Sequence, residues 1–358
     1  MQSSMHDLIV LSGLRCVHLR CSFKALNPTQ FYQSLSPTLR GAVGWALREI
    51  SCVRGCSELA QRDRRKVQKN CKVPYCPYAK TFLSYGWPTS ISRVHPATYR
   101  IITPYVDGRS DIHASESFTF DLWLFGKNYN YSTYWILAFL KAGLKGIGES
   151  KSRLQLETVD EVFHQTRLWD IEASYHPQLA PYWQLSDVIQ DLGEQSPSDE
   201  SSYIIEIHWQ TPYIFKEITS VDHPMSLYQL AKAIIRRVHA LFCAFEKNHP
   251  IFYEKETLQS YTQSEIICSH LSNSEQIRYS HNHKKNLRLD GIYGKVTYRL
   301  MSSYLRWIYY LLQIGELIGV GSQTMMGFGS YRMYLFHEDE YRCQSCEEEF
   351  WIIEEDPT

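Results

Sequence analysis

Alternating hydrophobic and polar positions mark two similar series of strands and helices, one in each half of the chain. In the first half, a strand, a helix and a second strand are predicted over residues 118–125, 131–142 and 153–159. The second half repeats this order over residues 295–300, 303–314 and 330–336. Glycines separate the helix from the last strand in both halves. Because the same unit closes each half, the pattern indicates two duplicated domains.

Each half also opens with a strand and a helix. Residues 7–23 alternate as a strand does, and Ser36 and Pro37 are typical of an N-cap and a first helical turn. The second half opens with a predicted strand over 203–209 and a predicted helix over 226–246. Two β-α-β-β-α-β units of the α+β class therefore fit the chain better than a doubly wound sheet, which needs more strand–helix alternations.

A stretch rich in Asp, Ser, Gly and Gln over residues 185–202 is predicted to link the two halves. We therefore expect an N-terminal domain over residues 1–185, a C-terminal domain over 200–337 and an acidic tail over 338–358. The tail holds nine acidic residues and one basic residue. The rest of the chain holds 36 basic and 29 acidic residues, a net charge of +7, which favours a polyanionic partner.

The composition is that of a folded protein. Of the 358 residues, 44% are hydrophobic and 21% are charged, which excludes the disordered and collagen-like classes. The sequence contains no run of 18 uncharged apolar residues, so no membrane-spanning helix and no membrane partner are predicted. The N-terminus lacks the basic and apolar segments of a signal peptide, and we expect a cytoplasmic protein.

Basic residues gather in two places outside the tail. The cluster over residues 62–72 fits a solvated face as well as it fits an RNA contact. The cluster over residues 278–299 also contains tyrosines and the two histidines His281 and His283. Aromatic residues between basic ones suit base stacking, and a solvated face does not require them. The second cluster therefore predicts a nucleic-acid-binding surface.

Glycines punctuate residues 315–329, after the last predicted helix. The Gly-Val-Gly at 319–321 is not a dinucleotide-binding fingerprint, because no strand precedes it closely and no helix follows it. A turn is one use of such a segment. The other is a loop whose backbone amides approach a phosphate, with Ser322, Gln323 and Thr324 as further donors. The recurrence of a glycine loop in both halves favours phosphate binding.

Four cysteines are spaced as C-x3-C-x14-C-x4-C at Cys52, Cys56, Cys71 and Cys76. This spacing is close to that of a four-cysteine zinc site. Disulfides and lone buried thiols are the alternatives, but nothing in the sequence indicates secretion. We predict structural zinc that holds the basic segment 61–72. Four thiolates leave no open coordination position, so this zinc would not be catalytic.

Several short motifs occur in an order that resembles one known family, from about residue 8 to residue 336. They are Leu39–Leu47, the cysteines ending in Cys76-Pro-Tyr78, Lys145–Gly148, Arg278–Ser280, Asp290–Gly294 and Gly319–Tyr331. Together they resemble the CRISPR-associated RAMP proteins, in particular the endoribonucleases of the sixth Cas family, which cut precursor CRISPR RNA within its repeats. The resemblance implies two tandem ferredoxin-like domains and a glycine-rich loop near the C-terminus that contacts RNA.

The resemblance also implies the chemistry. In that family the RNA 2′-hydroxyl attacks the adjacent phosphate without a metal, leaving a 2′,3′-cyclic phosphate (or a 3′-phosphate) and a 5′-hydroxyl. The protein then has to align the attack, move protons and stabilise charge on the phosphorus. His281 and His283 are candidates for base and acid, because an unperturbed histidine pKa of about 6.5 makes both protonation states available near neutrality.

The first predicted helix offers a second candidate catalytic site. Several relatives have a catalytic histidine where Trp45 stands in this chain, and Trp45 cannot transfer a proton. Tyr32, Arg40 and Arg48 are the nearest polar candidates there, with His18 on the preceding predicted strand. This departure keeps open an RNA-binding RAMP subunit that does not cut.

The expected partners are CRISPR repeat RNA or mature crRNA, and other Cas proteins of an effector complex. The predicted RNA-binding residues come from the basic cluster and the glycine loop: Arg278, Ser280, Lys284, Lys285, Arg288, Gly319, Gly321, Ser322, Gln323, Thr324, Gly327 and Gly329. The leading hypothesis is a metal-independent endoribonuclease, and the alternative is a non-catalytic subunit that holds the repeat tag of the crRNA. A zinc-stabilised interaction protein with no RNA role is a third possibility.

Overall fold

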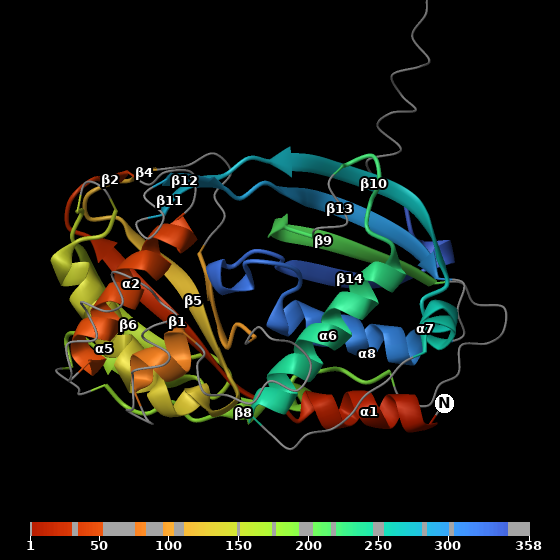
Figure 1. Cartoon of the computed structure of the whole chain (residues 1–358), viewed down its shortest axis with the longest axis horizontal. Helices are drawn as coiled ribbons and strands as arrows, with labels where there is room; N and C mark the ends of the chain where they lie inside the picture. Colours follow the sequence, from red (N-terminus) through yellow and green to blue (C-terminus); the bar gives the residue numbers. More distant parts are fainter. Residues whose placement is uncertain are drawn as a thin grey trace, which may run out of the picture.

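Two antiparallel sheets, each accompanied by helices, stand side by side in the computed structural model of the chain (Figure 1). The structure describes residues 2–30, 35–52, 76–83, 96–103, 111–148, 151–173, 177–192, 203–215, 220–245, 254–280, 285–300 and 304–342. The mixture of helices with antiparallel strands confirms the α+β class predicted from the sequence. Among the described residues, no helix is both long enough and apolar enough to cross a membrane.

The N-terminal sheet has the strand order β3-β5-β1-β6-β7, and β8 pairs with one end of β1. Its strands are β1 (Arg15–Ala25), β3 (Tyr99–Ile102), β5 (Ser117–Phe125), β6 (Leu154–Glu161), β7 (Thr166–Asp170) and β8 (Trp183–Gln184). The helices α2 (Leu35–Ser51) and α5 (Ser132–Lys145) pack on one face of this sheet. Alternation along β1 directs Val17 and Leu19 toward these helices and His18 toward the opposite face.

The C-terminal sheet has the strand order β10-β13-β9-β14. Its strands are β9 (Tyr203–Tyr213), β10 (Ser264–Ser274), β13 (Gly291–Leu300) and β14 (Tyr331–His337). The helix α6 (Leu227–Phe245) follows the first of these strands and α8 (Leu305–Ile318) precedes the last. In both sheets the first and third strands of a β-α-β-β-α-β unit are central neighbours, and the fourth pairs with the first. This is the ferredoxin-like arrangement, and the prediction of two such domains is confirmed.

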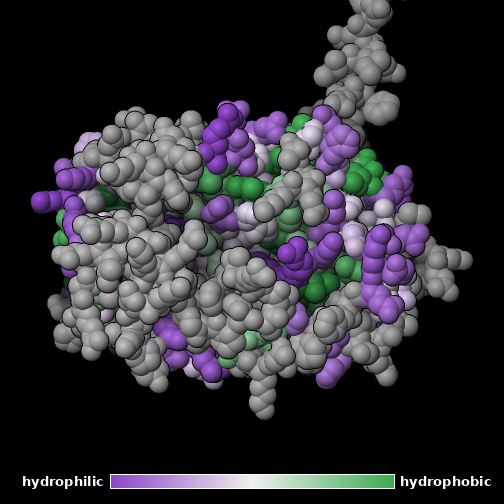
Figure 2. Space-filling model, in the orientation of Figure 1, coloured by the Kyte–Doolittle hydropathy of each residue, from purple (hydrophilic) through white to green (hydrophobic). Residues whose placement is uncertain are grey.

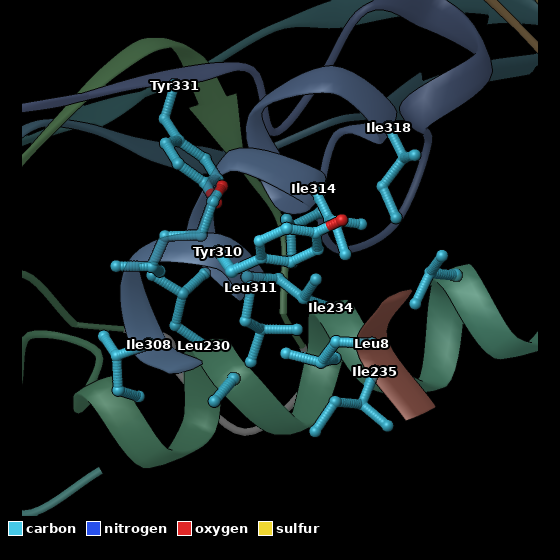
Figure 3. Packing of buried hydrophobic residues seen from close by; sticks show 14 of the residues in the cluster. Leu8, Leu230, Ile234, Ile235, Ile308, Tyr310, Leu311, Ile314, Ile318 and Tyr331 are labelled. Carbon is cyan, nitrogen blue, oxygen red and sulfur yellow. The ribbon is translucent and has the colours of Figure 1, made fainter. Parts of the chain in front are cut away.

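The N-terminal helix α1 (Gln2–Ser12) packs on the helices α6 and α8 of the C-terminal domain. Leu8 lies between Ile235 of α6 and Tyr310 of α8 (Figure 3). The Ser12 hydroxyl is 2.8 Å from the hydroxyl of Tyr310. The strand predicted from residue 7 is therefore wrong as far as Ser12, and the strand β1 begins only at Arg15.

The predicted N-cap at Ser36 is also wrong. The helix α2 already includes Leu35, and the Ser36 hydroxyl is 2.7 Å from the hydroxyl of Thr103 instead of capping its own helix. This bond joins the first turn of α2 to the end of β3. Ser36 therefore fixes the helix against the edge of the N-terminal sheet.

Smaller elements complete the fold. They are the π-helix η1 (Tyr78–Phe82), the 3-10 helices η2 (Gly126–Tyr131), η3 (Leu185–Asp187), η4 (Thr324–Met326) and η5 (Glu338–Glu340), the helix α7 (Lys255–Tyr261), and the paired strands β2 (Thr29–Gln30) and β4 (Asp111–Ile112). The hairpin strands β11 (Ile277–Ser280) and β12 (Lys285–Arg288) extend β10 and β13 toward the N-terminal domain (Figure 1). This hairpin carries the first part of the basic cluster over residues 278–299, whereas Lys295 and Arg299 lie on β13.

Candidate functional site

The glycine-rich loop (residues 319–329) joins α8 to β14 and lies where the two domains meet. The 3-10 helix η4 inside it contacts β3 and α2 of the N-terminal domain. At Gly327 the fit is close, since a Cβ built there would come 2.7 Å from the carbonyl oxygen of Ile101 and 3.5 Å from the Ser36 hydroxyl. The loop is therefore packed between the domains.

Most of the described amides of this loop bond to the protein itself. Val320 N donates to the Gly329 carbonyl (2.9 Å), Ser322 N to the Ile214 carbonyl (2.9 Å) and Gly329 N to the Pro212 carbonyl (2.9 Å). The Thr324 side chain is buried, whereas Ser322 is exposed. The loop amides therefore hold the loop in shape, and Ser322 offers its hydroxyl to a ligand at the surface.

The β11–β12 hairpin is anchored on this loop. Leu289, directly after β12, packs in a small apolar cluster with Met326 and Phe328 of the loop. The Leu289 amide donates to the Gln276 carbonyl (2.7 Å), which closes the base of the hairpin. The fold thus connects hairpin, loop and the start of α2, three elements far apart in the sequence.

On α2, Arg40 faces aromatic rings. Its guanidinium carbon lies 4.6 Å from the centre of the Phe82 ring and 5.9 Å from that of Tyr99. Cation–π contacts of this kind hold the cationic group in a fixed direction. Arg40 is half-buried near the Ser36 end of the helix, where a fixed positive charge could stabilise an anionic transition state.

Several predicted site residues lie outside the described residues: Tyr32, His281, His283, Lys284, Cys56 and Cys71. Three more, Arg278, Ser280 and Lys285, lie on the hairpin strands, where the backbone is described and Ser280 pairs with Lys285. In sequence, residues 281–284 connect these two strands. The structure therefore places the strands that flank the two histidines, and the catalytic assignment of His281 and His283 stays a prediction.

Arg288 at the end of β12 is exposed but already pairs with acids. Its guanidinium lies 3.3 Å from the carboxylate of Glu275 and 3.0 Å from that of Asp290. Figure 2 shows hydrophilic residues along part of the upper edge of the molecule. Since exposed pairs are weak, an RNA phosphate can compete for Arg288, at the cost of leaving two carboxylates beside the RNA.

The helix α2 contains no histidine. Trp45 is 47% exposed, and the Arg48 guanidinium carbon lies 4.5 Å from the centre of its ring. His18 lies on the opposite face of the sheet, stacked on Trp123 and 3.1 Å from an Asp121 carboxylate oxygen. His18 therefore lies on the face of the sheet away from α2.

Two of the four predicted zinc ligands are described. Cys52 follows the last residue of α2, and Cys76 comes two residues before η1. Within the described part of the chain, no three His, Cys, Asp or Glu side chains gather as a metal site would require. Because Cys56 and Cys71 lie outside that part, the four-cysteine site stays a prediction.

Neither Arg100 nor Ser330 was among the predicted site residues, and the structure places both beside the glycine-rich loop. Arg100 Nη2 donates to the Ser330 hydroxyl (2.5 Å), and Arg100 is fully buried on β3. From the sequence alone, an arginine inside a short apolar strand is expected to be exposed at the edge of a sheet. Here the C-terminal domain packs on β3 and buries Arg100.

Family models match both halves of the chain. Residues 14–180 match a model described as an N-terminal domain, AF_1859_N, and residues 207–331 match the model of the CRISPR-associated endoribonuclease Cas6. None of the curated protein sequences matches the chain. The fold has two ferredoxin-like domains, and the C-terminal one is similar to Cas6. The resemblance found in the sequence is confirmed over residues 207–331.

Solved structures share the fold. A chain of a partial Cas6-RT-Cas1–Cas2 complex and a chain of a Cas6-RT-Cas1–Cas2 complex each match 92% of this chain with a TM-score of 0.53 at 15% identity. This chain spans 47% of the length of the first and 30% of the second. The Cas6 of Thermus thermophilus matches 90% of this chain over 99% of its own, with a TM-score of 0.45 at 14% identity.

Proposed function

We propose that the protein is a metal-independent endoribonuclease that cuts CRISPR repeat RNA in precursor crRNA and so generates guide RNAs. The observation that carries this proposal is the match of residues 207–331 to the Cas6 family model. That range includes the basic hairpin and the glycine-rich loop, which lie together in the fold. The net positive charge of the chain outside its tail supports a polyanionic substrate.

In the proposed reaction the RNA provides the nucleophile. The 2′-oxygen forms a bond to the adjacent phosphorus and loses its proton to a base, while the bond from phosphorus to the 5′-oxygen breaks and that oxygen gains a proton from an acid. The products are a 2′,3′-cyclic phosphate and a 5′-hydroxyl. His281 and His283 would exchange the protons, with Tyr32 as a further donor, and Arg40 would stabilise the negative charge that develops on the phosphoryl oxygens.

The RNA-binding residues divide between the hairpin and the loop. Arg278, Lys284, Lys285 and Arg288 would contact phosphates, since such contacts position a strand without reading its bases. Ser322 of the glycine-rich loop adds an exposed hydroxyl. Because the loop also contacts α2, a strand bound to it would pass close to Arg40.

A second candidate function is a non-catalytic RAMP subunit that holds the repeat tag of the crRNA. The exposed Trp45 favours it, because an indole cannot transfer a proton and an exposed aromatic ring suits base stacking. Both functions include other Cas proteins as partners, and two structurally similar chains come from complexes with Cas1 and Cas2.

The two functions and the third possibility, an interaction protein without RNA, differ in one assay. The protein is incubated with repeat RNA in an excess of chelator, and the ends of any product are mapped. The proposed enzyme leaves a cyclic phosphate or a 3′-phosphate together with a 5′-hydroxyl. Intact but bound RNA indicates the non-catalytic subunit, and no salt-dependent RNA binding excludes both.

We also propose that Cys52, Cys56, Cys71 and Cys76 hold one structural zinc ion. Purified protein is then expected to contain about one zinc per chain, and Cys52→Ser or Cys76→Ser to remove it, because a four-thiolate site binds zinc weakly once a ligand is lost. Metal analysis and thermal unfolding with and without chelator provide the measurement. Cys343→Ser is the matched control and should keep the zinc. The assignment is contradicted if the purified protein contains no zinc and its unfolding temperature is the same with and without chelator.

A further inference from the structure

The C-terminal end of α8 is bound by arginines from both domains. Arg237 of α6 donates from Nε to the Ile318 carbonyl (3.0 Å), and Arg100 of β3 donates from Nη1 to the Leu317 carbonyl (2.8 Å). The last carbonyls of a helix have no partner within the helix and lie at the negative end of its dipole. Both guanidinium groups therefore bind at a backbone position that favours positive charge.

Arg100 alone of the two also reaches the far end of the glycine-rich loop. Its Nη2 donates to the Ser330 hydroxyl (2.5 Å), and that hydroxyl donates to the Gly327 carbonyl (2.8 Å). The loop itself begins at Gly319, directly after α8. One side chain of the N-terminal domain thus contacts both the start and the end of a loop that belongs to the C-terminal domain.

Gly319 makes room for this arginine. Its φ is +70°, and a Cβ built there would lie 2.5 Å from Cζ of Arg100. Any larger residue would push the guanidinium out of its place. The first glycine of the loop is thus explained by contact with Arg100, without reference to a phosphate.

Arg100 occupies a costly position. It is 1% exposed, and among the described residues the groups it bonds are neutral carbonyl and hydroxyl oxygens. Burial and the nearby charge of Arg237 lower the pKa of Arg100 to about 9. Taking a charged group out of water carries a large free-energy penalty, and hydrogen bonds to neutral oxygens offset only part of it. The net contribution of Arg100 to stability is therefore smaller than its hydrogen bonds suggest.

We propose that Arg100 is a positioning residue, which fixes the glycine-rich loop against the N-terminal domain so that the loop and α2 contact one RNA strand together. This role rests on the proposed function, because it assumes that RNA binds at the loop. The guanidinium acts through Ser330 and the backbone of the loop and does not itself touch the RNA.

The test compares Arg100→Met with Arg237→Met. Both remove a guanidinium that bonds to the same helix end, where Arg100 is buried and Arg237 is half-buried, but only Arg100 contacts Ser330. We expect Arg100→Met to fold and to lower single-turnover cleavage of repeat RNA about 100-fold, as a misplacement of about 1 Å can do, and Arg237→Met to stay within about threefold of the wild type. Equal losses in the two variants would overturn the proposal.

Coupling to Ser330 gives a second readout that a merely structural role would not produce. Ser330→Ala should show part of the cleavage loss, and the double variant should be no slower than Arg100→Met, because both changes break the same connection. Arg100→Lys keeps a cation and should recover part of the rate. If the losses of cleavage rate in Arg100→Met and Ser330→Ala added up in the double variant, Arg100 would not act through Ser330.

Hydrogen exchange separates this proposal from the proposed function, since it needs no RNA. In Arg100→Met the amides of Val320 and Gly329 should exchange at least about tenfold faster, while the paired amides of β9 and β13 stay unchanged. If the wild type ignores RNA but this pattern is found, the proposed function fails and the positioning of the loop stands. Unchanged exchange at Val320 and Gly329 would overturn the role of Arg100.

Discussion

Replacing Gly329 by alanine is expected to lower both stability and RNA binding. The φ of Gly329 is +67°, and a Cβ built there would lie 1.7 Å from the Val320 carbonyl oxygen, which is backbone and cannot turn aside. Left-handed backbone costs about 1–2 kcal/mol and overpacking about 1–3 kcal/mol, so we expect a loss of about 2 to 4 kcal/mol. Because the loop would open, affinity for repeat RNA should fall as well. Chemical denaturation and RNA titration measure the two effects.

Gly41→Ala is the matched control for this substitution. A Cβ at Gly41 meets nothing within 4 Å, and the residue is exposed inside α2. The change should stabilise the protein by about 0.5 to 1 kcal/mol, because alanine loses less backbone freedom in a helix than glycine does. If Gly329→Ala were as harmless as Gly41→Ala, the described close packing of the loop would be wrong.

The second large effect is expected from Lys284→Ala combined with Lys285→Ala. Removing two phosphate contacts should weaken RNA binding about tenfold and make its dependence on salt less steep by about 1.4, since each contact to a single strand contributes about 0.7 to the slope. Binding is measured across a series of salt concentrations. The proposed reaction also predicts a slower cut, because fewer contacts hold the strand.

A control for charge is the pair Lys127→Ala and Lys255→Ala, two exposed lysines on η2 and α7. They change the net charge equally but belong to other elements, so the salt slope should stay close to that of the wild type. An equal flattening in both double variants would mean that RNA responds to overall charge. An unchanged slope in the hairpin variant would remove residues 284 and 285 from the interface.

The sequence was sufficient for the architecture because each domain repeats one pattern. The strand expected over 118–125 is β5, the helix expected over 131–142 is α5, and the helix expected over 226–246 is α6. Local alternation and helical spacing dominate in these elements, since each buries one face against a sheet or helix of its own domain. They were therefore predictable without knowledge of the partner domain.

The failures occur where distant parts of the chain decide the structure. The apolar positions of α1 fit a strand as well as a helix, and packing on α6 and α8 of the other domain selects the helix. In the same way, Ser36 bonds to Thr103, and Arg100 bonds to Leu317 and Ser330. Such contacts join residues more than 60 positions apart, so no local sequence pattern predicts them.

The local composition of the chain predicted which segments form the candidate site, but not how these segments lie relative to one another. Basic residues clustered with tyrosines indicated the hairpin, and glycines indicated the loop. The sequence did not indicate that Leu289 anchors the hairpin on the loop. The expectation that bare loop amides face a phosphate changes most, because the described amides of Val320, Ser322 and Gly329 bond to protein carbonyls. The surface of the site is therefore made by side chains, with the loop as their support.

In the proposed reaction, RNA bound to this protein is cut by its own 2′-hydroxyl. The decisive experiment uses repeat RNA that carries a single 2′-deoxy nucleotide at the cleavage position and compares binding and cleavage with the all-ribose RNA in the presence of chelator. We expect affinity within about twofold and no detectable product, because a strand without the nucleophile keeps every phosphate contact. Cleavage of the 2′-deoxy strand at the same position would contradict it.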